Sequence, residues 1–162
     1  MKEKETFLNT LAHEAKTTIK VLNAYPAGHE DLKPSEKNKT ARDLAFAFIA
    51  EQALATAAIR GQMSMDAFAP ASGTIPEIIA RYEKEVHETA EKVRAMSDAD
   101  WNGEMDFMVG PGKMSKVRRA DILWLTLHDM IHHRGQFSIY LRMAGGKLPS
   151  IYGPSADTNP WA

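Results

Sequence analysis

The sequence predicts an all-α protein, a four-helix bundle formed by one domain over residues 1–162. Four long segments carry apolar residues at helical spacing, and most of them are bounded by capping residues, glycine or proline. A chain of 162 residues with 44% hydrophobic and 25% charged residues also suits a single core. We expect one interruption, a short excursion between the third and fourth long helices.

Apolar periodicity predicts the first two helices. Residues 3–25 repeat apolar side chains at helical spacing, and Pro26 ends the pattern. After a polar connection, residues 38–61 form the most apolar segment of the chain, and Thr40 or Ser35 can cap its start. These two helices form the first half of the predicted bundle.

The remaining helices have sharper boundaries. The letters TIPE at 74–77 form a capping box with proline in the first turn, which predicts a third helix from that point. The last helix should cover about residues 116–144, because two glycines at 145–146 stop it. Before it, alternating residues around the letters GPG at 110–112 predict either a small hairpin or an extended segment. This segment is the expected excursion.

Composition and charge exclude several classes of protein. A formal net charge of −1 gives no long-range attraction for nucleic acid or an anionic membrane, so neither is an expected partner. Without cysteine there is no disulfide or thiolate nucleophile, and metal ligands must come from histidine and carboxylates. The sequence has no apolar signal core near its start and no run of about 18 apolar residues. We therefore expect a cytoplasmic protein.

The chemical signal lies in the last predicted helix, in the letters LTLHDMIHHRGQ at 125–136. His128 and His132 are four residues apart, so both imidazoles lie on one helix face and can reach a single divalent metal ion. At about 100° per residue, the same face holds Leu125 and Ile139. The histidine pair is therefore predicted to occupy the core stripe of this helix.

A carboxylate in the second predicted helix is the candidate third ligand. Glu51 shares a face with the apolar residues Leu44 and Phe48. An ionised group buried alone would cost several kcal/mol, so Glu51 should face a cation, a metal ion or a hydrogen-bonded histidine. The alternative places Glu51 at the edge of the bundle, where it reaches water.

Three neighbours of the histidine pair have separate interpretations. His133 projects about 100° away from His132, and we expect it to make a hydrogen bond or to contact a neighbouring helix or subunit. Gln136 continues the histidine row and is expected to orient a ligand or a bound water. Gly135 lowers helix stability relative to alanine, which suggests that another helix approaches its backbone closely.

Together these residues resemble a known family. The pattern HxxxH at 128–132 continues as HRGQ at 133–136, the segment 148–155 reads LPSIYGPS, and the second helix opens with TARDLA at 40–45. This combination is similar to the DinB-like proteins, which are induced by DNA damage and grouped with metal-dependent thiol transferases. The resemblance covers nearly the whole chain. It implies an up-down-down-up bundle with a long crossover, often dimeric, that holds nickel or zinc between three histidines.

This sequence lacks one of the three histidines that the family's metal site normally contains. It assigns two of the metal-binding histidines to His128 and His132, while the third normally follows the opening of the second helix. Here residues 45–49 read AFAFI and contain no histidine. Either Glu51 supplies a carboxylate and completes a site with open coordination positions, suited to hydrolytic or oxygen chemistry, or the site is degenerate and binds metal weakly or not at all.

Two functions follow as expectations. As an enzyme, the protein would be a stress-related metal-dependent hydrolase or small-thiol transferase, with Glu51 as ligand or general base and Gln136 orienting the reacting groups. As a non-enzyme, it would be a dimeric bundle with a degenerate metal site that binds a small ligand or a protein partner. A homodimer is expected in both cases.

Overall fold

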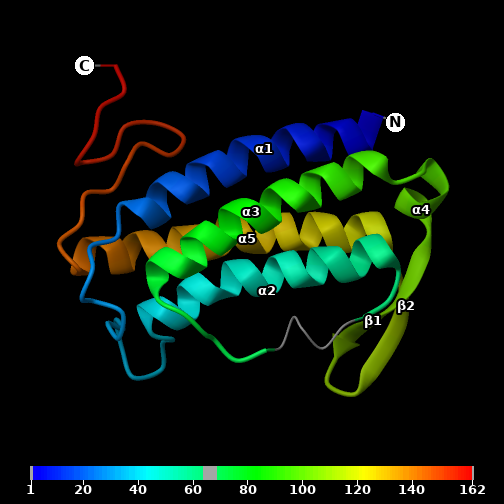
Figure 1. Cartoon of the computed structure of the whole chain (residues 1–162), viewed down its shortest axis with the longest axis horizontal. Helices are drawn as coiled ribbons and strands as arrows, with labels where there is room; N and C mark the ends of the chain where they lie inside the picture. The colour runs from blue at the N-terminus through cyan, green and yellow to red at the C-terminus, as the bar shows by residue number, and fades with distance from the viewer. Residues whose placement is uncertain (1, 64–68, 162) are drawn as a thin grey trace.

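The computed structural model describes residues 2–63 and 69–161. Its elements, in chain order, are α1 (Lys2–Asn23), α2 (Ala41–Arg60), α3 (Ile75–Ala95), α4 (Asp98–Asn102), β1 (Glu104–Gly110), β2 (Lys113–Arg118) and α5 (Arg119–Met143). The long helices form a bundle in which α1 and α2 each pack against both α3 and α5 (Figure 1). The predicted all-α four-helix bundle is confirmed.

The helix directions also match the expectation. In Figure 1, α1 and α5 run in one direction, whereas α2 and α3 run in the opposite direction. Helix α2 ends at the opposite end of the bundle from the start of α3, so residues 61–74 connect two helix ends that lie a full helix length apart. This connection is the long crossover that the resemblance implied, and residues 64–68 within it lie outside the described part of the chain.

Local side-chain chemistry sets the helix ends. The hydroxyl of Thr40 accepts a hydrogen bond from the backbone N–H of Asp43 at 3.1 Å and caps the start of α2. Gly61 ends that helix in the left-handed conformation, with φ 73°. At the start of α3, Thr74 and Glu77 form the predicted capping box.

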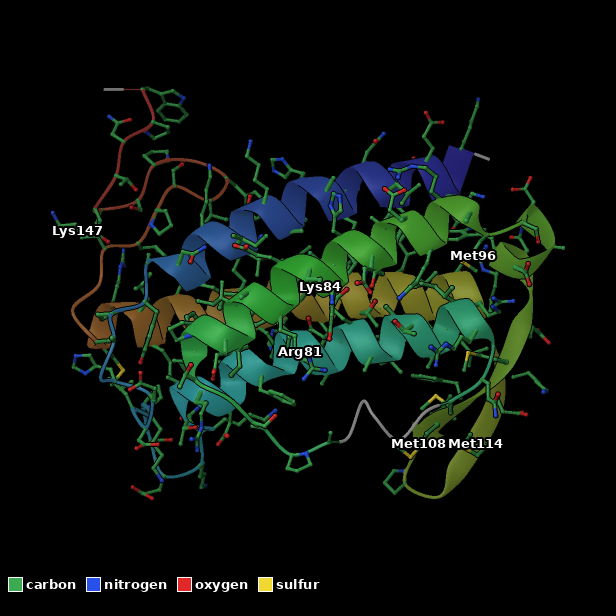
Figure 2. The ribbon with its side chains drawn as sticks, in the orientation of Figure 1. Arg81, Lys84, Met96, Met108, Met114 and Lys147 are labelled. Carbon is green, nitrogen blue, oxygen red and sulfur yellow. The ribbon has the colours of Figure 1, made fainter. Side chains whose placement is uncertain are left out.

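The short excursion between α3 and α5 contains the helix α4 and a two-stranded antiparallel hairpin, β1 with β2. The hairpin extends beyond one end of the bundle, and Met108 and Met114 lie on it with 46% and 55% of their surface exposed (Figure 2). Of the two alternatives expected for this segment, the hairpin is the one present. Strand β2 ends at Arg118, and α5 begins at the next residue, Arg119.

A buried arginine fixes the first turn of α5 to the last turn of α2. The Arg119 guanidinium donates to the backbone oxygens of Ala58, at 2.7 Å, and of Ile59. It also forms an ion pair with Asp100 at 2.7 Å. The Ala58 oxygen also accepts from the backbone N–H of Gly61, whereas the bond to the Ile59 oxygen pairs one of the last carbonyl groups of the helix. Arg119 therefore holds in register the two helices that carry the candidate site.

A second buried arginine ties the C-terminal segment to the bundle. Arg134 is 2% exposed and forms an ion pair with Glu14 of α1 at 2.7 Å. It also donates to the hydroxyl of Tyr152 at 2.6 Å, and that hydroxyl donates to Glu14 at 2.8 Å. The three side chains form a closed hydrogen-bonded network between α1, α5 and the segment after α5.

No helix in the described ranges has both the length and the apolar character needed to cross a membrane.

Candidate functional site

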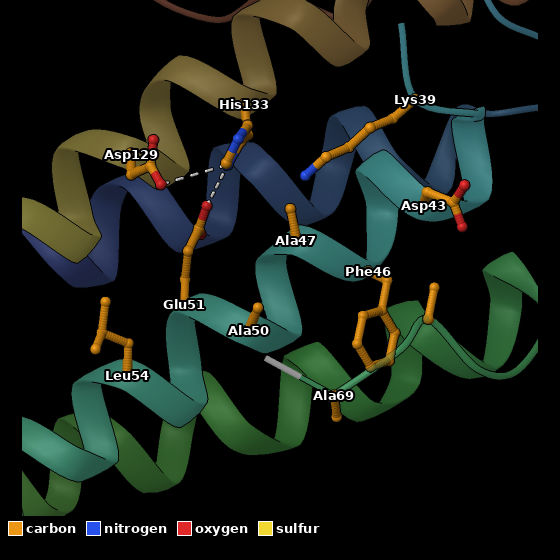
Figure 3. A pocket seen from close by; sticks show the side chains of 11 residues that line it. Lys39, Asp43, Phe46, Ala47, Ala50, Glu51, Leu54, Ala69, Asp129 and His133 are labelled. Carbon is orange, nitrogen blue, oxygen red and sulfur yellow. Dashed lines mark hydrogen bonds and ion pairs between the residues drawn. The ribbon is translucent and has the colours of Figure 1, made fainter. Parts of the chain in front are cut away.

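A pocket of about 540 Å³ opens between α2, α5 and the segment that leads into α3 (Figure 3). Its wall is mainly apolar and is formed by Phe46, Ala47, Ala50, Leu54, Ala69 and Ala71. Its polar lining consists of Lys39, Asp43, Glu51, Asp129 and His133. A mostly apolar cavity with a few converging polar groups is typical of a small-molecule site.

Three of these polar side chains converge on one point. His133 Nδ1 donates to Glu51 Oε1 at 2.5 Å and lies 3.9 Å from Asp129 Oδ2 (Figure 3). One ligand atom from each residue lies within 4.8 Å of the other two. Asp129 and His133 are four residues apart on α5, so they share the helix face that meets Glu51 of α2.

The burial of Glu51 leaves one of its oxygens without a partner. Its side chain is 5% exposed, and Oε2 has no hydrogen-bond partner among the described residues. A buried acceptor that is left unsatisfied costs about 1–3 kcal/mol, and more when it is charged. A cation bound between Glu51, Asp129 and His133 would satisfy this oxygen. The residues present therefore fit a divalent metal ion.

Burial and their mutual hydrogen bond change the pKa values of both Glu51 and His133. Burial raises the pKa of Glu51 to about 7, although the hydrogen bond to His133 opposes that shift. The same hydrogen bond raises the pKa of His133, and its partial burial acts in the opposite direction. The pair therefore retains a proton near neutral pH when no metal is bound.

This shared proton predicts how the stability of the metal-free protein depends on pH. A group whose pKa is raised on folding stabilises the protein below its unfolded pKa, and that contribution is lost as the pH rises through the folded value. Folding raises the pKa of both Glu51 and His133. We therefore expect the free energy of unfolding of the wild-type protein to fall by on the order of 2 kcal/mol, relative to that of Glu51→Gln, between about pH 5 and pH 8. Urea unfolding across this range measures the difference. Parallel stability curves for the two proteins would contradict the assignment.

A sequence model of the DinB family matches residues 1–160. The chain belongs to the DinB family. No curated protein matches it.

Two solved DinB-like structures share the fold of this DinB-family chain. A DinB-like protein from Bacillus cereus ATCC 10987 is 20% identical, with a TM-score of 0.76, and the match covers 91% of this chain and 97% of that one. A DinB-like protein from Bacillus subtilis is 18% identical, with a TM-score of 0.72, and the match covers 90% and 97%. At these identities the likeness concerns the fold alone.

In this DinB-family chain the predicted histidine pair faces outward. His128 and His132 are exposed, and His128 stacks on Trp124 with ring centroids 5.8 Å apart. Neither histidine belongs to a group of three converging metal-ligand side chains within the described ranges. The prediction that they occupy the core stripe was wrong, and the structure does not bring them together with Glu51. Gln136 is exposed as well, and its amide contacts Nε2 of His132 at 3.0 Å.

The structure confirms the expected surroundings of Glu51, while its role as a metal ligand or general base stays a prediction. Glu51 is buried and hydrogen-bonded to a histidine, which is one of the arrangements expected from the sequence. The alternative, in which Glu51 lies at the edge of the bundle and reaches water, was wrong. The hydrogen bond expected of His133 is also present. Asp129 was missed, although its spacing from His133 is the same as that between the two exposed histidines. A comparison of both four-residue pairs against each possible buried face would have identified it.

Proposed function

We propose that the protein binds a divalent metal ion through Glu51, Asp129 and His133, and that it acts there on a small molecule by hydrolysis or thiol transfer. The observation that carries the proposal is the buried Glu51, whose Oε2 has no partner within the described residues and whose neighbours are a carboxylate and an imidazole. One imidazole with two carboxylates suits zinc, nickel or manganese. Such an ion, when bound with an open coordination position, supplies a Lewis acid and lowers the pKa of bound water.

The lining of the pocket supports a small, partly apolar substrate. Phe46 and Leu54 belong to the apolar wall beside Glu51, and Lys39 extends its ammonium group into the same pocket beside Ala47 (Figure 3). An ammonium group near the metal ligands favours a substrate with an anionic group, such as a carboxylate or a thiolate. Lys39 would orient that group, while the apolar wall would exclude water from the reacting end.

Metal content tests this proposal. Protein purified without an affinity tag or chelator should retain close to one divalent ion per chain, or should bind zinc, nickel or manganese in a calorimetric titration with a 1:1 stoichiometry. A bound ion would justify an activity screen with low-molecular-weight thiols and small esters. If none of the three ions binds, the metal proposal fails.

One observation favours a second function. The 2.5 Å hydrogen bond between His133 and Glu51 already gives each residue one partner without a metal ion. In this alternative, the pocket binds a small ligand without catalysis, and the Glu51 and His133 pair contributes hydrogen bonds. Binding of small carboxylate or thiol compounds by metal-free protein, with no turnover after metal is added, would support it.

A further inference from the structure

A second cavity, of about 240 Å³, lies between α2 and α3. It shares no lining residue with the pocket that contains the candidate metal ligands. Gln52 and Arg60 line it from α2, eight residues or about two helical turns apart. The α3 side is formed by four charged residues at helical spacing: Arg81, Glu85, Glu88 and Lys92.

Gln52 is the polar group of this cavity that the fold leaves unsatisfied. The residue is 5% exposed, and its side-chain oxygen Oε1 has no hydrogen-bond partner among the described residues. A buried acceptor without a partner destabilises the folded state, and native proteins pair most such groups. An N–H or O–H group of a ligand in the cavity would supply the missing donor.

The two helices place carboxylates beside Gln52. Helices α2 and α3 run in the same direction (Figure 1), and the guanidinium of Arg81 lies over the ring of Phe46, 5.8 Å from its centroid. Six residues further along α2, Gln52 is therefore level with Glu85 and Glu88 of α3. Arg81 is already paired with Glu85, at 2.7 Å. This end of the cavity is rich in acceptors and favours a positively charged donor, such as an ammonium group.

The other end of the cavity carries cations. Arg60 and Lys92 lie in the last turns of α2 and α3. Long side chains in a helix lean toward its N-terminus, so both residues extend back over the cavity that they line. Lys92 lies 3.5 Å from Glu88, but both side chains are nearly half exposed, so a ligand carboxylate can replace Glu88 at little cost. This end therefore favours a carboxylate.

We propose that this cavity binds a small ω-amino carboxylate, with its ammonium group at Gln52 and its carboxylate at Arg60 and Lys92. The ammonium group donates to Oε1 of Gln52 and to the carboxylate of Glu88, while the methylene chain lies along α2, where Ala53 and Ala57 also line the cavity. The backbones of Gln52 and Arg60 are about 12 Å apart along the helix axis. A chain of four or five carbons therefore reaches both ends better than glycine does.

Calorimetric titration of metal-depleted protein, in a buffer without amines or carboxylates, tests the proposal. The probes are glycine, γ-aminobutyrate and δ-aminopentanoate, together with butylamine and butyrate, which each lack one of the two end groups. At least one of the two longer amino carboxylates should bind at least ~10-fold more tightly than glycine, butylamine or butyrate, because only it forms charge-assisted hydrogen bonds at both ends. If no amino carboxylate binds, or if butylamine or butyrate binds equally well, the proposal is overturned.

Two variants test the two ends of the site separately. Gln52→Met removes the unpaired acceptor at similar side-chain length, so the ligand-free protein should have a Tm at least as high as that of the wild type, yet its affinity for the amino carboxylate should fall at least ~10-fold. Gln62→Met is the matched control, because Gln62 is exposed beyond α2 and does not line the cavity. Arg60→Gln should lower the affinity to a similar extent. Unchanged affinity in either Gln52→Met or Arg60→Gln overturns the proposal. Because these titrations use metal-depleted protein, their failure is distinguishable from failure of the proposed function.

Discussion

Replacing His133 with alanine should weaken zinc or nickel binding by at least ~100-fold, since changes that only reorient a ligand already cost 10–100-fold in metal affinity. His133 supplies the imidazole of the buried cluster and contacts both carboxylates, at 2.5 Å and 3.9 Å. The double variant His128→Ala and His132→Ala is the matched control, because both residues are exposed on the same helix. We expect that variant to keep the affinity of the wild-type protein in calorimetric titration.

The carboxylates of Glu51 and Asp129 should contribute unequally to metal affinity. Glu51 is 5% exposed, whereas half of the Asp129 side chain is exposed, so water can replace an Asp129 oxygen more readily. Glu51→Gln should therefore weaken metal binding more than Asp129→Asn. Loss of binding in the double histidine variant, together with tight binding by His133→Ala, would contradict the cluster. It would favour the ligand set first expected from the sequence, His128 and His132.

The fold could be predicted from sequence because its boundaries depend on local chemistry. The capping box of Thr74 and Glu77, and the glycine after α2, act over a few residues and do not depend on what packs nearby. The direction of each helix is harder to derive, since it depends on where the crossover over residues 61–74 leads. Only the resemblance to a known family predicted that feature.

The site was harder to predict because α5 has two plausible buried faces. We expected the face of Leu125 and Ile139 to be buried, whereas the structure buries the face of Met130 and Phe137. A rotation of one residue, about 100°, separates the histidine pair from the pair formed by Asp129 and His133. Periodicity within one helix cannot resolve such a difference when apolar residues occur on every side.

Removing the carboxylate of Glu14 should cause the largest loss of stability, because Glu14→Ala leaves the buried Arg134 guanidinium without its counter-charge. Arg134 is 2% exposed, and its ion pair with Glu14 is 2.7 Å long. Breaking one side of a buried pair costs ~3–5 kcal/mol, which corresponds to a fall in Tm of about 10 °C for a chain of this size. Thermal and urea unfolding measure both quantities.

Two further variants separate the uncompensated charge from loss of packing. Tyr152→Phe removes only the hydroxyl that bridges Arg134 and Glu14, and it should cost about 1 kcal/mol. Combining Glu14→Leu with Arg134→Met replaces both charges with apolar side chains, and it should recover most of the stability lost in Glu14→Ala. If the double variant is as unstable as Glu14→Ala, packing rather than charge is the main contribution of this network. Because Arg134 directly follows His133, the same series also tests whether anchoring the C-terminal segment keeps His133 in place. In that case metal affinity should fall in Glu14→Ala and return in the double variant.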